Sequence, residues 1–460
     1  MSTPSRFKQA LRIVLRYDEN AKLNLFEVFP GLKHFFIHRR NLAYIRTFGD
    51  LFFTALIILG LFGPQDPQRN VSLFILWGIW WTGVVMSWFY TGRLWCGFCP
   101  FPGIGRFFQR FGLSLNLDVP NIFKKYCVYL AVILLAVIIW TEEVTNLKSW
   151  PAGTAYLLIS ILLGATVLGV IFKGQAWCRH VCPLGKMIGS ASTLSLTEFR
   201  PDFSKCKTCK TFACRRGTDS APGCPVYLGA INVRNNLNCL VCGRCISLCD
   251  SDSPRINLRN PFTELVINKG RYLTCSYFIP FLMGSQLARF IHHAPMYQSL
   301  ESVFLNSDPL AFTSILIIGF ILFIAIIRLG GWLFTITEDE VFGRFSPLIP
   351  VLIPLAFAGE LAYRLKYLLT NLGDFFPTFG RQFGFNTVYL AFTIPEFFSL
   401  TVCCFVLAIG GMAGSYVLYL FYHGDFEGMI PRKNYLTIHL LFFLVFLSYI
   451  ALFGQTFAFD

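Results

Sequence analysis

Eight cysteines in two runs are the residues of this sequence best suited to hold a redox cofactor. The first run reads Cys206-x2-Cys209-x4-Cys214-x9-Cys224-Pro225, and the second reads Cys239-x2-Cys242-x2-Cys245-x3-Cys249. Thiolates at the spacing of the second run can surround a [4Fe–4S] cube, and in such runs the fourth cysteine ligates the neighbouring cube. This rule predicts two [4Fe–4S] clusters. Their ligands would be a first thiol set, Cys206, Cys209, Cys214 and Cys249, and a second thiol set, Cys239, Cys242, Cys245 and Cys224.

The irregular first run leaves other assignments open. Its gaps of four and nine residues stand where two and three are usual, so four local ligands in each run are an alternative. Paired C-x2-C motifs also suit tetrahedral Zn²⁺, although a zinc ribbon does not need the complete second run. Disulfides are disfavoured, because we expect this segment in the cytoplasm, where thiols stay reduced.

Four more cysteines belong to an internal repeat. Segments 92–100 and 174–183 both have the form G-x-x-W-C-x(2–3)-C-P, and they supply the motif thiols, Cys96, Cys99, Cys178 and Cys182. Each Cys-Pro step is expected to open a helix with proline at its first position, near a positive helix end that favours thiolate. The motif thiols predict a further cluster or a pair of redox thiols, with simple packing as the alternative. The other cysteines have no pattern and are expected to pack: Cys127, Cys275, Cys403 and Cys404.

The rest of the chain has the composition of a membrane protein. Hydrophobic residues make up 55% of its 460 residues and charged residues only 14%, against about 25% charged in soluble proteins. A span needs about 20 mostly apolar residues. Eight segments qualify, at roughly 44–63, 71–91, 122–141, 153–172, 309–331, 346–368, 397–422 and 435–455. A ninth span is predicted near 272–290, where Pro280 and Gly284 interrupt the apolar sequence.

Charge in the loops predicts how the chain is oriented. Loop 92–121 and segment 173–260 are basic, whereas loop 141–152 is acidic. By the positive-inside rule, the N-terminus and segment 173–260 lie in the cytoplasm of a prokaryotic cell, and the spans cross its inner membrane. The net charge of +14 is therefore attributed to topology and membrane lipid, and not to nucleic acid.

These observations predict a polytopic α-helical membrane protein of about eight or nine transmembrane helices with a small cytoplasmic α+β insert, similar to a bacterial ferredoxin with two [4Fe–4S] clusters. Four regions are expected. They are a basic cytoplasmic segment at 1–43, a four-helix membrane unit with the first motif at 44–172, the ferredoxin-like domain with the second motif at 173–260, and a membrane domain of about four or five helices at 261–460.

The order of four spans, two W-C-x(2–3)-C-P motifs and a cysteine-rich insert resembles the membrane polyferredoxin family over roughly residues 40–260. That family includes the quinol-oxidising membrane subunit of periplasmic nitrate reductase systems, a regulator and electron donor of nitrous oxide reductase, and a copper-reducing accessory protein of cytochrome oxidase assembly. The stretch from Cys224-Pro225 through Asn232-Val233-Arg234-Asn235 to Cys249-Asp250 is most similar to the copper-reducing branch. The resemblance implies electron transfer through [4Fe–4S] clusters without identifying the acceptor.

Two features differ from that family. The first motif has C-x2-C where the family usually has C-x3-C. Residues 300–460 form four more predicted spans, where the copper-reducing branch carries a soluble C-terminal domain. The function of these last spans is not indicated by any family motif.

Ionisable residues in the second membrane half are candidates for function, because charge inside a bilayer is costly. Glu360 and Arg364 lie four residues apart and are expected to form an ion pair on one helical face. His292 and His293 are expected on the outer face, where they could serve a quinone site or a partner protein. His439 could ligate haem b, but the sequence offers it no convincing histidine partner, so haem b is not favoured.

We therefore predict an electron-transfer subunit of an oxidoreductase complex. It would pass single electrons through its clusters between a quinol, or a soluble donor, and a redox partner protein. No catalytic residue is assigned. One alternative is a copper reductase or assembly factor for a respiratory metalloenzyme, because soft thiolates favour Cu(I). The other is a transport or anchoring subunit gated by the redox state of the clusters.

Overall fold

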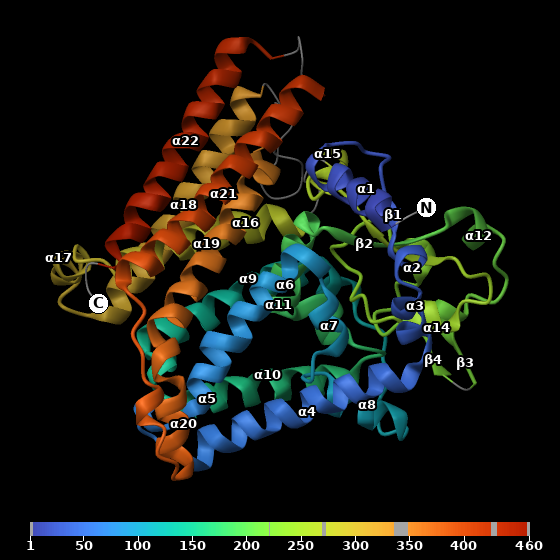
Figure 1. Ribbon diagram of the computed structural model, residues 1–460, viewed down its shortest axis with the longest axis horizontal. Coiled ribbons are helices and arrows are strands. Elements are labelled where there is room, and N and C mark those ends of the chain that lie inside the picture. The colour runs from blue at the N-terminus through green and yellow to red at the C-terminus, as the bar shows by residue number, and fades with distance from the viewer. Residues whose placement is uncertain (1–2, 220, 269–272, 335–347, 425–429, 458–460) are drawn as a thin grey trace. The chain divides into compact units, whose positions relative to one another are not determined.

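The computed structural model describes residues 3–219, 221–268, 273–334, 348–424 and 430–457 (Figure 1). They form two compact units whose segments alternate along the chain. Unit 1 comprises Met1–Ile57, Met86–Ala131 and Tyr156–Ile267, and unit 2 comprises Ile58–Val85, Val132–Ala155 and Asn268–Asp460. Five of the described helices contribute residues to both units: α4 (Arg39–Phe62), α6 (Trp81–Thr91), α9 (Asn121–Val144), α10 (Pro151–Ile171) and, by its last residue alone, α15 (Thr263–Asn268).

Eight long apolar helical segments confirm the eight predicted spans. Their bounds are Arg39–Phe62, Val71–Thr91, Asn121–Val144, Pro151–Ile171, Asp308–Leu333, Leu348–Phe383, Glu396–Gly424 and Arg432–Gln455. Each is long and apolar enough to cross a membrane. The ninth predicted segment forms helix α16 (Leu273–His292), with Pro280 inside it, and is not one of these eight. The starts predicted at 272 and 346 lie outside the described residues.

Unit 1 contains short helices and, in the described chain, all of the strands. Its further helices are α1 (Thr3–Leu15), α2 (Leu25–Val28), α3 (Pro30–Ile37), α7 (Leu94–Phe98), α8 (Gly103–Arg110), η4 (Trp177–Val181), α11 (Pro183–Ala191), η5 (Ser192–Leu194), α12 (Phe203–Lys207), α13 (Ala213–Arg216), η6 (Ala230–Asn232), α14 (Arg244–Leu248) and α15 (Thr263–Asn268). Strands β1 (Leu23–Asn24), β5 (Pro254–Leu258) and β2 (Thr197–Pro201) form an antiparallel sheet in the order β1-β5-β2. A second pair joins β3 (Gly217–Thr218) to β4 (Ala221–Pro222).

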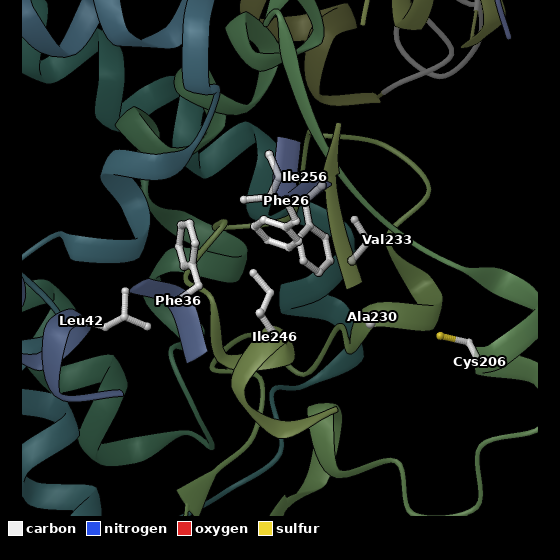
Figure 2. Close-up of a cluster of buried hydrophobic side chains, with 9 residues drawn as sticks. Phe26, Phe36, Leu42, Cys206, Ala230, Val233, Ile246 and Ile256 are labelled. Carbon is white, nitrogen blue, oxygen red and sulfur yellow. The ribbon is translucent and has the colours of Figure 1, made fainter. Parts of the chain in front are cut away.

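A buried apolar core connects the N-terminal segment with the cysteine-rich segment. Phe26 of α2, Phe36 of α3 and Leu42 of α4 belong to the same core as Ile246 of α14 and Ile256 of β5 (Figure 2). All five side chains are at most 8% exposed. Burying a side chain of this size contributes roughly 1.5–3 kcal/mol. The N-terminal segment therefore helps to hold α14, the helix that carries Cys245.

Unit 2 is a helical bundle. Its further helices are η1 (Pro67–Arg69), α5 (Val71–Leu73), η2 (Phe74–Trp80), η3 (Leu147–Ser149), α16, α17 (Tyr297–Val303), α18 (Asp308–Leu333), α19 (Leu348–Asn371), η7 (Leu372–Asp374), α20 (Phe375–Phe383), η8 (Val388–Leu390), α21 (Glu396–Gly424) and α22 (Arg432–Gln455). Helix α19 packs against α16 and α21, and α21 packs against α22 (Figure 1). Gly414 of α21 permits the contact with α19, since a Cβ there would lie 2.7 Å from the carbonyl oxygen of Val351.

Buried charges in unit 2 are paired. The predicted ion pair is confirmed, because Arg364 Nε donates to Glu360 Oε1 over 2.9 Å. Arg289 of α16, which is 0% exposed, donates to the other oxygen of Glu360 over 2.6 Å. Arg364 also donates to Glu142 Oε2 at the end of α9, over 3.1 Å. These charged side chains inside the bundle are therefore joined in ion pairs, as a low dielectric requires.

Candidate functional site

Unit 1 brings the four motif thiols together. Cys99 interacts electrostatically with Cys178, Cys96 and Cys182, and Cys178 interacts in turn with Cys182 and Cys96. All four side chains are partly buried free cysteines. Two segments that are far apart in the sequence therefore supply one group of thiols.

The second motif forms a wide turn followed by a helix. Residues Trp177–Val181 form η4, a π-type turn in which the N–H of Cys182 donates to the carbonyl of Trp177 over 2.8 Å. Cys182 then caps α11, with Pro183 in the first turn and the N–H of Gly185 donating to Cys182 Sγ over 3.2 Å. The indole of Trp177 also hydrogen-bonds to this sulfur. The Cys-Pro step opens a helix here, as the sequence predicts, and π-type turns are frequent at functional sites.

The first motif does not follow that prediction. Cys99 is the C-cap that follows α7, and α8 begins only at Gly103, so Pro100 is not the first residue of a helix. The physical reason is a second proline, Pro102, which disfavours helical geometry at Phe101. The N–H of Phe101 still hydrogen-bonds to the sulfur of Cys99.

Burial dominates the acidity of the motif thiols. It raises the pKa of Cys99 and of Cys178, and neighbouring thiols raise both further. Burial also raises the pKa of Cys182 to about 11, although the N–H of Gly185 lowers it. The expectation that a helix end favours thiolate here is therefore wrong, because desolvation exceeds the effect of the helix dipole. A coordinated metal would reverse this balance, since a ligand thiol is deprotonated outright.

Cationic side chains lie beside the motif thiols. Arg93 is 3% exposed, and its Nη1 donates to the carbonyl of Leu237 over 2.6 Å. Within the described residues its Nε and Nη2 have no hydrogen-bond partner. Arg93, Arg106 and Lys186 all interact electrostatically with motif thiols. Unpaired guanidinium N–H groups are costly to bury unless an anion lies beside them, so the site suits a group of net negative charge, such as a cluster with four thiolate ligands.

The first thiol set gathers around α12, α13 and the end of α14. Cys206 interacts electrostatically with the other three thiols of the set. The Oγ of Ser253 lies 3.1 Å from Cys206 Sγ, and the N–H of Ser253 donates to Cys249 Sγ over 3.4 Å. The N–H of Ala230 donates to Cys214 Sγ over 3.5 Å. Hydrogen bonds to sulfur of this kind tune the potential of an iron–sulfur cluster.

The second thiol set lines a single cavity. All four of its cysteines border this space, and the rest of the wall is largely apolar, with Val226, Leu228 and Leu240. Burial raises the pKa of Cys239 to about 12. Cys245 shares a hydrogen bond with Cys214 of the first thiol set, so the two sets are neighbours. The structure thus gathers the same two groups of four that the sequence analysis assigned, and their ligation of clusters stays a prediction.

A backbone contact joins the first motif to the second thiol set. A Cβ on Gly97 would lie 2.9 Å from the carbonyl oxygen of Leu240 and 3.0 Å from Cys242 Cα. Arg46 of α4 spans the same contact. Its Nε donates to the carbonyl of Gly97 over 3.0 Å, and its Nη2 donates to the carbonyl of Cys242 over 3.4 Å. The motif thiols, the second thiol set and the first thiol set are therefore contiguous in unit 1.

Sequence reasoning missed Arg93 and Arg46. Arg93 stands inside the first motif, where a basic residue among apolar ones was the available signal. Arg46 lies within a predicted span, and a charge in that position is itself an indication of function. The unpatterned cysteines Cys127, Cys275 and Cys403 are buried, as expected, and Cys404 is partly buried.

Comparison with known proteins points to the same part of the chain. Residues 73–117 and 154–190 match the family described as a 4Fe-4S binding domain, and these two ranges contain the two motifs. The chain is 27% identical over 169 residues to an uncharacterized protein of Methanocaldococcus jannaschii, and the alignment covers 35% of this chain and 63% of that protein. It is 24% identical over 168 residues to the ferredoxin-type protein NapH of Escherichia coli, and this alignment covers 33% of the chain and 55% of NapH.

The chain thus spans 55% to 63% of the length of these curated relatives. No solved structure matches it significantly. The 4Fe-4S domain coincides with the motif thiols, and the eight apolar helices place it in a membrane setting. Over the part that contains the two motifs, the chain is therefore similar to membrane-associated 4Fe-4S proteins of the polyferredoxin type.

Proposed function

We propose that this protein passes single electrons through three iron–sulfur clusters, between a donor and a partner redox protein. The 4Fe-4S domain and the similarity to NapH support iron–sulfur electron transfer at a membrane. The first and second thiol sets would each hold one [4Fe–4S] cluster, and the motif thiols would hold the third. The iron–sulfur groups supply one-electron chemistry. The chain supplies ligands, hydrogen bonds to sulfur and an apolar wall.

The observation that carries this proposal is the contiguity of the three groups of thiols. Gly97 brings the motif thiols to the backbone of Cys242, and the hydrogen bond between Cys245 and Cys214 links the second thiol set to the first. A structural zinc site would not need three neighbouring groups, whereas a path for electrons does.

Arg93 supports a charged group at the motif thiols in particular. Two of its buried nitrogen groups have no hydrogen-bond partner in the described parts of the chain, and Arg106 and Lys186 add further positive charge. Three cations next to neutral thiols would be unfavourable, but they would offset the negative charge of a four-thiolate cluster.

The orientation of the proposed path follows from loop charge. The N-terminal segment 1–43 and the domain 173–260 would lie on the cytoplasmic side, flanked by membrane domains at 44–172 and 261–460. The donor would be a membrane quinol or a reduced soluble carrier. The insert would have a ferredoxin-like arrangement of its two clusters.

A basic groove in unit 1 offers a docking site for the partner. It has a volume of about 1020 Å³ and is lined by six basic and three acidic side chains, Arg6, Lys22, Arg200, Lys207, Arg234, Arg255, Glu27, Glu198 and Asp202. Ion pairs between Lys22 and Glu198 and between Arg255 and Asp202 leave net positive charge. Lys207 belongs to α12, the helix of Cys206. An acidic redox protein steered to this groove would meet the first thiol set.

Copper reduction is the second candidate function, and one observation favours it. Four partly buried thiols at one point are soft ligands of the kind that select Cu(I). Under this alternative, the motif thiols would bind the metal as substrate, and the other two sets would deliver the electron.

Low-temperature EPR of the anaerobically reduced protein tests the proposed path. We expect interacting [4Fe–4S]⁺ signals, because the first and second thiol sets are neighbours. Cys242→Ser should remove one signal and leave the other without its magnetic interaction. A protein that contains zinc and no sulfide would refute electron transfer, and copper bound by the motif thiols without iron would favour the second candidate.

A further inference from the structure

Unit 2 contains a group of potential metal ligands that is separate from all of the patterned cysteines. Each of three residues offers one ligand atom, and these atoms lie within 4.8 Å of one another: Glu143 near the end of α9, His292 at the end of α16 and the adjacent His293. We call these three residues the Glu143 site. From the sequence, loop 141–152 contributes only its charge to the predicted topology, and His292 and His293 are expected on the outer face, available to a quinone site or a partner protein.

The two oxygens of Glu143 have different surroundings. The residue is 6% exposed, and its Oε1 accepts from Lys148 Nζ over 3.2 Å and from the hydroxyl of Tyr363 over 2.7 Å. Its Oε2 lies 2.9 Å from His293 Nε2 and 3.8 Å from His292 Nδ1. One oxygen is thus held by the protein, and the other faces two imidazoles.

The ring of His292 is oriented by a second carboxylate. Its Nε2 lies 3.0 Å from Asp308 Oδ1, which also accepts from the hydroxyl of Tyr297 over 2.6 Å. The N–H of this imidazole is therefore assigned to Nε2, and the lone pair to Nδ1. Within the described residues, the buried Nδ1 has no hydrogen-bond partner. A lone pair and a carboxylate oxygen that face each other repel, and either a proton on Nδ1 or a metal ion between the two atoms removes that repulsion.

The charges around the Glu143 site also leave room for a cation. Its network contains four carboxylates, Glu142, Glu143, Asp308 and Glu360. It contains three permanent cations, Lys148, Arg289 and Arg364. Four negative charges against three positive charges give one uncompensated negative charge when both histidines are neutral. A bound divalent ion would offset this negative charge and leave the network with one net positive charge.

We propose that the Glu143 site binds one divalent transition-metal ion of the zinc type through Glu143 Oε2, His292 Nδ1 and His293 Nε2. Two imidazoles and one carboxylate are a ligand set that Zn²⁺ uses with a fourth position left open. Asp308 is a positioning residue, in the carboxylate–histidine–metal arrangement that fixes the tautomer of a ligand. The hydroxyl of Tyr363 lies 3.3 Å from His293 Nε2 and donates to Glu143 Oε1, so it contacts two of the three residues. This site is independent of the iron–sulfur proposal.

The test uses the full chain in detergent, loaded with iron and sulfide, stripped of adventitious metal and titrated with Co²⁺ and then Zn²⁺. We expect about one ion per chain, with a visible Co²⁺ spectrum that lacks sulfur-to-metal charge transfer, and a zinc X-ray absorption shell of nitrogen and oxygen at about 2.0–2.2 Å. A sulfur shell, or no binding above background, would overturn the proposal.

Several substitutions around the Glu143 site are measured, so that the test still gives a result if one variant fails to fold. His292→Ala should abolish binding, and Asp308→Asn should weaken it by about 10- to 100-fold. Lys148→Met should strengthen it, because a competing cation next to Glu143 is removed. The matched control is His439→Ala, a histidine on α22, which should bind as wild type does. If wild type, Asp308→Asn and Lys148→Met bind the metal ion with equal affinity, the ion does not occupy the Glu143 site and the proposal is wrong.

Discussion

Gly97 lies directly against Cys242, so that a Cβ at position 97 would come within 3.0 Å of Cys242 Cα and 2.9 Å of the carbonyl oxygen of Leu240. This contact places Cys96 and Cys99 of the first motif beside the cysteine-rich segment. The absence of a side chain on residue 97 is therefore a structural condition for the proposed path from the motif thiols to the second thiol set.

Gly97→Ala is expected to disturb that junction. Neither contacting atom belongs to a flexible side chain, so the backbones must separate, at a cost of about 1–3 kcal/mol. We expect a lower thermal midpoint and slower electron transfer between the motif site and the second thiol set, measured by rapid-freeze EPR. The control is Gly83→Ala, since a Cβ on Gly83 meets no atom within 4 Å. Equal effects of the two substitutions would show that the contact has no special role.

Arg93→Met is expected to impair the motif site. It removes the buried positive charge beside Cys178 and Cys182, so a negatively charged cluster would bind less firmly and would be harder to reduce. The measurements are iron per chain and the midpoint potential of the affected EPR signal. Arg93→Lys should restore most of the iron because it retains the charge, and Arg110→Met, at the exposed last residue of α8, should have no effect. Full iron and an unchanged potential in Arg93→Met would argue against a cluster at this site.

Glu360→Gln is expected to destabilise unit 2 strongly. The substitution leaves Arg289 and Arg364 buried without the carboxylate they share, and loss of one partner of a buried ion pair costs about 3–5 kcal/mol. Equilibrium unfolding in mixed detergent micelles measures the change. The exposed Glu396→Gln serves as control and should change the free energy of unfolding by less than about 0.5 kcal/mol. Equal stability of both variants would mean that the network contributes little.

Lys207→Glu is expected to slow electron exchange between the proposed clusters and an acidic partner protein. Charge reversal in the basic groove opposes steering, so the association rate at low ionic strength should fall about tenfold, and the difference should vanish at high salt. Stopped-flow kinetics with an acidic one-electron carrier measures the rate. Lys433→Glu, at an exposed position in unit 2, is the control. A rate unaffected by Lys207→Glu would remove the groove from the proposed path.

Apolar segments and paired charges could be predicted from the sequence because they depend on local features. Each of the eight predicted spans is a mostly apolar segment of about 20 residues, and a helix of that length satisfies its own backbone. The pair Glu360 and Arg364 follows from helical spacing alone. The start of α8 could not be placed correctly, because Pro102 outweighs the helix-starting preference of Pro100.

Long-range partners could not be read from the sequence. Arg93 faces the thiols of a motif some eighty residues away, and Glu143 faces histidines from another helix. The strand β1, from the basic N-terminal segment, pairs with β5 of the cysteine-rich segment through only two residues, too few to give a periodic pattern. Only the fold brings these residues together. The acidity of Cys182 was misjudged for the same reason, since burial among other thiols depends on tertiary structure.

The central claim, three neighbouring iron–sulfur clusters, is tested most directly by counting iron and acid-labile sulfide in anaerobically purified wild type and in the double variant Cys96→Ser/Cys178→Ser. Three cubes predict about 12 iron and 12 sulfide per wild-type chain and about 8 of each in the variant, with the interacting EPR signals of the first and second thiol sets retained. About 8 iron atoms in both proteins would contradict the third cluster and leave the motif thiols as redox or packing groups. Zinc without sulfide would contradict the electron-transfer account as a whole.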